Sequence, residues 1–294
     1  MPASLRIAVC TALLVATAVV HAGERLIHRE PSAYNGTLLV SEDSRGLRVL
    51  RFGEGGARQS VVKPGDPDHL ELAYTRAFPV TLAWVPQPRR ILVVGLGGGS
   101  IPRFLHHRLP EATIDAVELD PGVVKLAREL FDVQEDDRLR LHVADGRAWI
   151  ERASQRYDLV VLDAYGASAP PPALITREFL ASVRSLLTDQ GLVVGNLWHR
   201  NYNPRYDDMV TTYLDVFGEV SILALEGVGN KLVISGPATA RHDRDELLHR
   251  AGKVGRDLGL GPDLERVLRT GLRGADNRER AGQILTDKGL RLSQ

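Results

Sequence analysis

Strongly apolar short segments alternate with amphipathic segments from residue 89 to residue 236, and this alternation constrains the fold more than any other feature. Strands that are apolar on both faces are typical of a parallel sheet covered by helices on both sides. Residues 225–230, which join the last two apolar segments, are too few for a parallel crossover and predict an antiparallel hairpin. The sequence therefore predicts an α/β domain with a Rossmann-like, mainly parallel sheet of seven strands, at Arg90–Val94, Thr113–Leu119, Arg138–Val143, Tyr157–Leu162, Leu192–Asn196, Val220–Ala224 and Lys231–Ser235.

Different patterns flank this domain, which we place at residues 89–236. Residues 32–62 carry short apolar–polar alternations separated by glycine-containing turns, which predict a small antiparallel β domain at residues 23–66. Residues 67–88 place apolar side chains at helical spacing and predict a connecting helix, with Pro79 as a kink or break. Residues 237–294 are charged and helical in pattern, so we expect a C-terminal helical extension without an evident site.

The charges of the chain are balanced, with 37 Lys and Arg residues against 37 Asp and Glu residues. A chain without an excess of either sign has no long-range field to attract nucleic acid or an anionic membrane surface. We therefore expect no nucleic-acid partner, and any recognition of charge must be local.

The first 22 residues have the layout of a signal peptide. An apolar run from Ile7 to Val20 follows Arg6, and the small residue Ala22 marks the expected cleavage point. The run is shorter than the roughly 20 apolar residues that span a bilayer as a helix. We expect export to the periplasm or secretion. An uncleaved membrane anchor, or a cytoplasmic protein with a misassigned start codon, remains open.

A glycine-rich turn follows the first strand of the α/β domain. Gly95, Gly97 and Gly99 follow the strand, and a helix with an apolar inner face begins after them. Ser100 occupies the third glycine position of a dinucleotide fingerprint, so that interpretation fails. The spacing fits instead the nucleoside–methionine turn of class I S-adenosylmethionine-dependent methyltransferases. We therefore expect a methyltransferase-like fold and assign these three glycines to cofactor binding.

Carboxylates follow the next strand. Glu118 and Asp120 end it, where a carboxylate can accept hydrogen bonds from both hydroxyls of a ribose. Asp120 precedes Pro121, the expected first residue of a helix, so capping of that helix is an alternative role for Asp120. Glu118 has no such structural task in the sequence and is the better nucleoside ligand.

Two further acidic positions follow later strands. Asp145 and Gly146 come after the third strand, where the carboxylate is placed to accept a hydrogen bond from an adenine amino group; a turn aspartate is the alternative. Asp163 ends the fourth strand, where open α/β sheets place reactive groups.

The chain resembles the spermidine synthase family of polyamine aminopropyltransferases over roughly residues 35–236, most of all a divergent bacterial branch with a Gly-Leu-Gly-Gly-Gly turn. The resemblance implies the architecture of that family, a small amino-terminal β domain before a methyltransferase-like sheet. It is carried by Val117-Glu118-Leu119-Asp120, Ala144-Asp145-Gly146, Tyr157-Asp-Leu-Val-Val-Leu-Asp163-Ala-Tyr165, Tyr74-Thr75-Arg76-Ala77 and the preceding segment from Gln59.

The resemblance also implies roles for individual residues. Gln59 lies beside the methionine-derived tail of the donor, Glu118 holds the ribose and Asp145 holds the adenine. Tyr74 borders the amine pocket, and Asp163 is the catalytic acid/base residue. The implied co-substrate is decarboxylated S-adenosylmethionine or S-adenosylmethionine, no cofactor is tightly bound, and the partner is a small-molecule amine. A homodimer is one possible assembly.

Two departures from the family pattern concern charge. The glycine turn of the family carries an aspartate where this chain has Gly98, and a second substrate-binding aspartate is replaced at Gly166. A diamine that enters a partly desolvated pocket needs carboxylates to replace its lost hydration. We therefore expect the chain to be a poor putrescine aminopropyltransferase with an intact nucleoside site.

Three functions remain open from the sequence. The first is an aminopropyl transfer to an amine. The second is a methyltransferase that acts on a small nucleophile, favoured by the missing carboxylate at Gly98. The third is an exported binding protein of the same fold without catalysis. We expect no metal site, because the adjacent His106 and His107 point to different faces of a helix.

Overall fold

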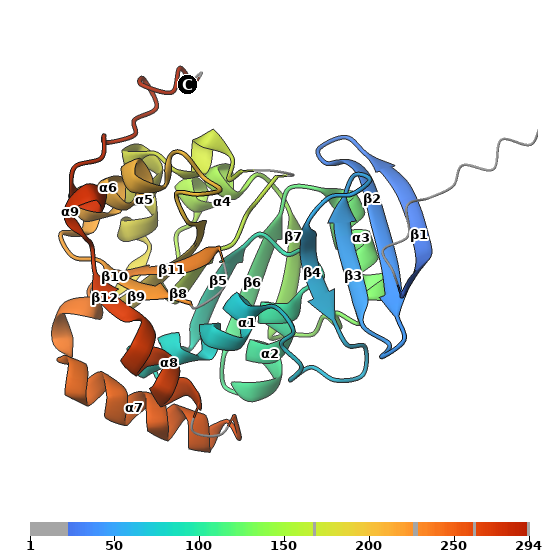
Figure 1. Cartoon of the computed structure of the whole chain (residues 1–294), viewed down its shortest axis with the longest axis horizontal. Helices are drawn as coiled ribbons and strands as arrows, with labels where there is room; N and C mark the ends of the chain where they lie inside the picture. The colour runs from blue at the N-terminus through green and yellow to red at the C-terminus, as the bar shows by residue number, and fades with distance from the viewer. Residues whose placement is uncertain (1–22, 167–168, 226–228, 261–262, 293–294) are drawn as a thin grey trace, which may run out of the picture.

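The computed structural model describes residues 23–166, 169–225, 229–260 and 263–292, and these residues form two sheets with helices around the larger one (Figure 1). The predicted signal peptide lies outside the described residues. Within them no helix is both long enough and apolar enough to cross a membrane.

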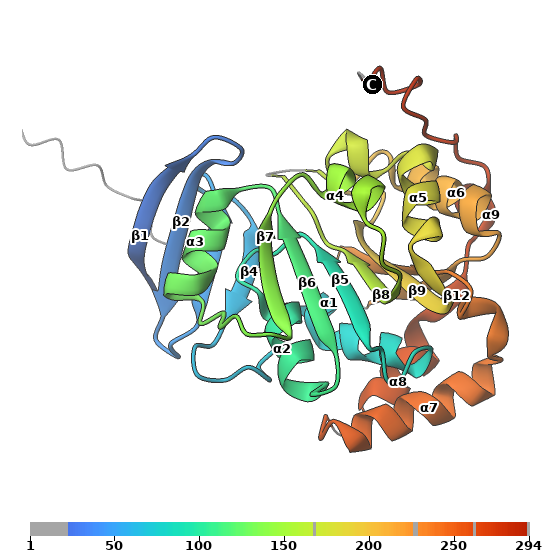
Figure 2. The ribbon, with the colours of Figure 1, turned by 180° about the vertical axis from the view of Figure 1, so that it is seen from behind.

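The N-terminal sheet is an antiparallel meander in the order β1-β2-β3-β4. Its first strand lies upstream of the alternations that predicted the others. Buried Leu38, Val40 and Leu50 give the sheet an apolar face, and they pack against Val123 and Leu126 of α3 (Pro121–Leu130) in the larger domain. Figure 2 shows α3 between this sheet and the edge of the larger one. The four strands are β1 (Glu24–Ser32), β2 (Gly36–Asp43), β3 (Arg48–Phe52) and β4 (Arg58–Val62).

The connecting segment is a short α-helix, α1 (Ala73–Ala77), followed by a 3₁₀ helix (Phe78–Ala83). Pro79 lies in the first turn of the 3₁₀ helix, where its missing amide hydrogen costs no hydrogen bond. The change of helix type thus occurs next to the proline that the sequence marked as a kink. All six residues of the 3₁₀ helix are buried, and they anchor the segment in the core.

The larger sheet confirms the predicted Rossmann-like, methyltransferase-like fold, but it has eight strands and not seven. Its order is β12-β10-β11-β9-β8-β5-β6-β7, and the hairpin of β10 and β11 is antiparallel as predicted. The eighth strand, β12, comes from the C-terminal extension and pairs antiparallel with β10. The strands are β5 (Arg90–Val94), β6 (Thr113–Glu118), β7 (Leu139–Val143), β8 (Tyr157–Leu162), β9 (Leu187–Trp198), β10 (Ser221–Ala224), β11 (Asn230–Ser235) and β12 (Leu272–Gly274).

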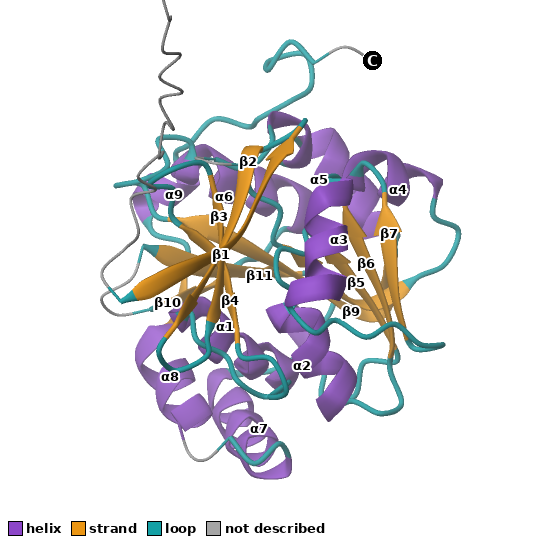
Figure 3. Cartoon of the chain, turned by 90° about the vertical axis from the view of Figure 1, so that its right-hand side faces the viewer, coloured by secondary structure: helices purple, strands orange, loops and turns teal. Residues whose placement is uncertain are grey.

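Helices cover both faces of this sheet (Figure 3). The buried side chains of α2, α7 and α8 form one apolar cluster with the 3₁₀ helix, and those of α4, α5 and α6 form a second cluster. The helices are α2 (Ser100–Arg108), α3 (Pro121–Leu130), α4 (Gly146–Arg152), α5 (Arg177–Ser185), α6 (Tyr206–Phe217), α7 (Arg244–Asp257), α8 (Asp263–Gly271) and α9 (Asn277–Arg280).

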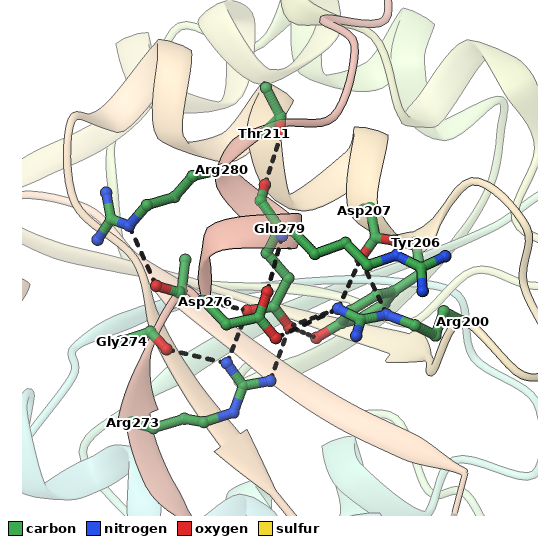
Figure 4. A network of polar contacts seen from close by, with 11 residues as sticks. Arg200, Tyr206, Asp207, Thr211, Arg273, Gly274, Asp276, Glu279 and Arg280 are labelled. Atoms are coloured by element: carbon green, nitrogen blue, oxygen red, sulfur yellow. Dashed lines mark hydrogen bonds and ion pairs between the residues drawn. The ribbon is translucent and has the colours of Figure 1, made fainter.

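Because β12 belongs to the C-terminal extension, the extension is not helical throughout. Hydrogen bonds to Glu279 attach it to the rest of the domain (Figure 4). The fully buried carboxylate of Glu279 accepts two hydrogen bonds from Arg273, at 2.6 and 2.7 Å, and one from the hydroxyl of Tyr206, at 2.7 Å. The sequence pattern did not predict β12, because a three-residue edge strand is too short to show alternation. These bonds join β12, α9 and α6.

Candidate functional site

A cavity of about 740 Å³ opens at the carboxyl ends of β5, β6 and β8 and extends to β4 and α1. This is the edge at which open α/β sheets bind ligands. Of the residues predicted for the site, Gly99 and Asp120 do not line the cavity. Those that do are Gln59, Tyr74, Gly95, Gly97, Glu118, Asp145, Gly146 and Asp163.

The glycine turn after β5 lies directly against the residues that follow β8. Gly95 has a φ of 95°, and a Cβ atom there would lie 2.4 Å from the backbone oxygen of Asp163. Only glycine fits a position that combines this conformation with such a close approach. Gly99, with a φ of 75°, is the N-cap residue of α2 and packs against Val133, so its role is to shape the turn rather than to line the cavity.

Glu118 lines the cavity and also holds the glycine turn in place. Its carboxylate accepts hydrogen bonds from the backbone N–H groups of Leu96, at 2.9 Å, and Asp120, at 3.1 Å. The expectation that Glu118 has no structural task is therefore wrong, because the end of β6 lies beside the turn after β5. Burial raises the pKa of Glu118, although the hydrogen bonds from backbone amides oppose this shift.

Asp120 has its alternative role, the capping of the helix that begins at Pro121. Its buried carboxylate accepts a hydrogen bond from the N–H of Gly122, at 2.8 Å, and so caps α3. The other oxygen accepts hydrogen bonds from the Ser32 hydroxyl and from the Asn35 amide. Asp120 therefore points to the N-terminal sheet and fastens it to α3, and the expected contact with a ribose is not supported.

Asp145 caps a helix and also lines the cavity. One oxygen accepts a hydrogen bond from the N–H of Ala148, at 2.8 Å, and caps α4. The residue also lines the cavity, together with Gly146, and it follows β7, which pairs with the strand that ends in Glu118.

Gln59 reaches the cavity through an irregularity in β4. The pairing of β3 with β4 shifts at this point, because Leu50 pairs with Ser60 but Arg51 pairs with Arg58. Gln59 is thus an extra residue, and such a bulge changes the direction of a side chain. Both Arg58 and Gln59 line the cavity, and the buried Nε2 atom of Gln59 has no hydrogen-bond partner among the described residues. A buried amide without a partner is suited to a ligand acceptor.

Tyr74 and Asp163 meet inside the cavity. The Tyr74 hydroxyl donates a hydrogen bond of 3.0 Å to Oδ2 of Asp163, and Nδ2 of Asn196 donates one of 2.8 Å to Oδ1. Burial raises the pKa of Asp163 to about 6, while the two hydrogen bonds lower it. Burial and the neighbouring carboxylate raise the pKa of Tyr74, which therefore remains a hydrogen-bond donor.

Four residues around this pair are not among the predicted site residues. Asn196 lies two residues before the end of β9, and its side-chain oxygen accepts a hydrogen bond of 2.9 Å from Asn230 of β11. The Tyr165 hydroxyl donates to the backbone oxygen of Asn196, at 2.7 Å, and its ring stacks on Trp198 with 5.2 Å between ring centroids. All four line the cavity. A polar residue at the end of a buried strand is the signal that could have found Asn196, whereas Asn230 has no local signal.

Gly98 and Gly166, the two positions that lack an expected aspartate, differ in the room that they leave for a side chain. A Cβ atom on Gly98 would lie 2.9 Å from Cδ1 of Phe131 and 2.9 Å from Oγ of Ser60, so these side chains fill the place of the family aspartate. At Gly166 the nearest atom of the described residues to a Cβ would be the backbone oxygen of Ala169, at 3.6 Å. A carboxylate fits at position 166 and does not fit at position 98 without movement of its neighbours.

Metal ligands do not gather in this cavity. In the described parts of the chain no group of three or more His, Cys, Asp or Glu residues could hold a metal ion. His106 and His107 instead pair separately, with Asp136 at 3.0 Å and Asp68 at 2.8 Å.

Comparison with known proteins identifies the family of the chain. Residues 74–217 match the model of the spermine/spermidine synthase domain. A polyamine aminopropyltransferase of Vibrio vulnificus is 35% identical over 217 residues, 71% of this chain and 71% of that protein. A probable spermidine synthase from Corynebacterium glutamicum has the same fold, with a TM-score of 0.69 and 21% identity over 90% of this chain and 96% of the other. An eEF1A lysine and N-terminal methyltransferase of Bos taurus is 36% identical over 50% of this chain and 22% of that protein.

Proposed function

Because the chain belongs to the spermine/spermidine synthase family, we propose that it transfers the amine-bearing propyl chain of an adenosyl-sulfonium donor to an amine. The donor is decarboxylated S-adenosylmethionine or S-adenosylmethionine. The hydrogen-bonded pair of Tyr74 and Asp163, in the same cavity as Glu118, carries this proposal. The pair supplies a proton acceptor, and Glu118 supplies a nucleoside anchor.

In the proposed reaction the lone pair of the amine nitrogen attacks the donor carbon next to the sulfonium. A carbon–nitrogen bond forms and the carbon–sulfur bond breaks, and its electron pair leaves with sulfur as neutral methylthioadenosine. The nitrogen loses one proton, and Asp163 accepts it. A carboxylate with a pKa of about 6 is ionised at neutral pH and is close to the ideal strength for a general base.

The neighbours of Asp163 position its carboxylate for this step. Tyr74 and Asn196 each donate a hydrogen bond to a different oxygen, which fixes the plane of the carboxylate. Asn230 orients Asn196 in turn, through the bond to its side-chain oxygen. In the proposed complex, Glu118 accepts hydrogen bonds from the ribose hydroxyls, and Asp145 accepts one from the adenine amino group.

The proposal is tested by release of methylthioadenosine from each donor, with and without a panel of amines. Asp163→Asn should lose about 10² to 10⁴ in turnover and keep its affinity for methylthioadenosine, since a general base contributes this much. Asp189→Asn is the matched control, because Asp189 has a side chain that is 92% exposed and lies outside the cavity. An Asp163→Asn enzyme as fast as the wild type would overturn the proposed role.

A second candidate is methyl transfer from S-adenosylmethionine. The missing carboxylate at Gly98 favours it, and so does the similarity to the eEF1A methyltransferase. The product separates the two reactions, because methyl transfer releases S-adenosylhomocysteine and propyl transfer releases methylthioadenosine. The third candidate, binding without catalysis, predicts nucleoside binding with neither product.

We also propose that residues 1–22 direct export, on the pattern of Arg6, the apolar run and Ala22. Cell fractionation and N-terminal sequencing of the exported chain test this. A mature chain that begins at Gly23 is the expected result, and a chain that retains Met1 in the cytoplasm would contradict it.

A further inference from the structure

The walls of the cavity leave one direction for the tail of the donor. Glu118 and Asp145 line it at the ends of β6 and β7, where the adenosine is proposed to bind. Asp163 lines it at the end of β8, where the amine is proposed to bind. The remaining wall is formed by β4 and α1, and Ser60 of β4 lies directly against the glycine turn, 3.3 Å from the Cβ position of Gly97.

This wall offers hydrogen-bond donors and positive charge. The bulge in β4 presents two consecutive side chains, Arg58 and Gln59, to the cavity. Among the described residues, the buried Nε2 atom of Gln59 has no hydrogen-bond partner, and the Arg58 guanidinium forms no hydrogen bond or ion pair. The Arg76 guanidinium, on the same wall, donates to a backbone oxygen and not to a carboxylate.

Negative charge on this wall is already neutralised. Glu71 is the acidic residue on the β4 and α1 side among the described cavity residues. Its two oxygens pair with Arg45, at 3.0 Å, and with His69, at 2.9 Å. The other carboxylate that a positively charged tail would use is absent, because Phe131 and Ser60 fill the space beside Gly98.

We propose that Arg58 and Gln59 bind the carboxylate of the donor tail, so that the donor is S-adenosylmethionine and not its decarboxylated form. The inference rests on the proposed function, since it requires the adenosine site. On the β4 and α1 wall, a tail with only an ammonium group would meet Arg58 and Arg76, and the described residues of that wall offer it no unpaired carboxylate. A tail with a carboxylate gains charge-assisted hydrogen bonds from both β4 side chains.

The product of the proposed reaction changes accordingly. The amine nitrogen forms its new bond to the same propyl carbon, the carbon–sulfur bond breaks, methylthioadenosine leaves, and Asp163 takes the proton. The carboxylate stays on the transferred chain, which is then a 3-amino-3-carboxypropyl group. The product therefore carries one negative charge more than the product of an aminopropyl transfer.

Calorimetry with three nucleosides tests the inference without an acceptor. Methylthioadenosine has no charged tail, S-adenosylhomocysteine has an ammonium and a carboxylate, and decarboxylated S-adenosylhomocysteine has the ammonium alone. The wild type should bind S-adenosylhomocysteine at least about tenfold more tightly than the decarboxylated compound, as expected of a charge-assisted contact. Equal or tighter binding of the decarboxylated compound would overturn the inference.

Substitutions of Arg58 and Gln59 test whether these two residues cause the preference for S-adenosylhomocysteine. Arg58→Gln and Gln59→Leu should each reduce the preference for S-adenosylhomocysteine and leave the affinity for methylthioadenosine unchanged. Arg90→Gln is the matched control, because Arg90 is also exposed but begins β5, at the opposite end of the strand from the cavity, and it should keep the full preference. If Arg58→Gln weakens all three ligands equally, the carboxylate is not its target.

The two proposals fail in different ways. Absence of methylthioadenosine binding would overturn the adenosine site, and the donor assignment with it. Binding of methylthioadenosine without any preference between the two tailed nucleosides would overturn the donor assignment alone. Turnover gives a second readout, because S-adenosylmethionine should release methylthioadenosine faster than the decarboxylated donor does.

Discussion

Tyr74 and Asp163 are 89 positions apart in the chain, and a hydrogen bond of 3.0 Å joins the hydroxyl of the first to Oδ2 of the second. Tyr74 lies on α1, before the larger sheet begins, whereas Asp163 follows β8 near the centre of that sheet. The bond holds α1 over the carboxyl ends of the strands. It also lowers the pKa of a carboxyl group that burial raises.

Tyr74→Phe removes this hydrogen bond and should raise the pKa of Asp163 above its value of about 6. The acidic limb of the rate profile should move to higher pH, and the rate at neutral pH should fall about tenfold or more, the cost of one hydrogen bond to a charged group. The measurement is kcat/KM against pH. Tyr213→Phe is the control, because Tyr213 lies outside the cavity. If the acidic limb of the profile stays at the same pH in Tyr74→Phe, Tyr74 does not influence the pKa of Asp163.

Asp163→Asn should change stability in a pH-dependent way. The folded pKa of Asp163, about 6, exceeds its ordinary value of 3.8, so the folded state binds the proton more tightly than the unfolded state. Wild-type stability therefore falls as pH rises from about 4 to 6, by at most about 3 kcal/mol from this group. The melting temperature of the variant minus that of the wild type should therefore be larger at pH 7 than at pH 4. A difference in melting temperature that is constant with pH would contradict this.

Glu118→Gln should weaken methylthioadenosine binding by about tenfold or more, because charge-assisted hydrogen bonds to the ribose become neutral ones. Since the carboxylate also holds the N–H groups of Leu96 and Asp120, Glu118→Ala should lose stability as well as affinity. Calorimetry and thermal melting separate the two effects. A Glu118→Gln protein of wild-type affinity would show that the ribose is bound elsewhere.

Replacement of the missing carboxylates should have unequal results. Gly98→Asp should cost about 1 to 3 kcal/mol, because its Cβ overlaps Phe131 and Ser60. Gly166→Asp makes only an ordinary contact with Ala169 among the described residues and should be tolerated. We expect the wild type to use putrescine poorly and Gly166→Asp to use it better, measured by methylthioadenosine release. Efficient wild-type turnover with putrescine, at around 1 per second or faster, would refute this.

Glu279→Gln should destabilise the protein by about 3 kcal/mol, because Arg273 then lacks the carboxylate that neutralises it. Glu265→Gln is the control, since Glu265 forms an exposed pair with Arg269 and should cost about 0.5 kcal/mol or less. Chemical denaturation measures both. Similar losses in the two variants would mean that the buried cluster does not anchor the C-terminal extension.

The sequence by itself determined the parallel core, the glycine turn and the acidic residues at the ends of its strands. These features are local, because the apolar period of a strand and the conformational freedom of Gly95 depend on a few neighbouring residues. Parallel strands also end at one edge of a sheet, so strand order alone predicts that Glu118, Asp145 and Asp163 lie around one cavity, as they do.

Only the tertiary structure decided how these residues divide their tasks. Asp120 and Glu118 are two positions apart, yet Asp120 turns to the N-terminal sheet while Glu118 faces the cavity. The bulge that exposes Gln59, the ring of Phe131 beside Gly98 and the pairing of β12 with β10 likewise depend on segments distant in the chain. The partners of a side chain are set by the packing of whole elements, and sequence periodicity carries no information about which distant group fills a given space.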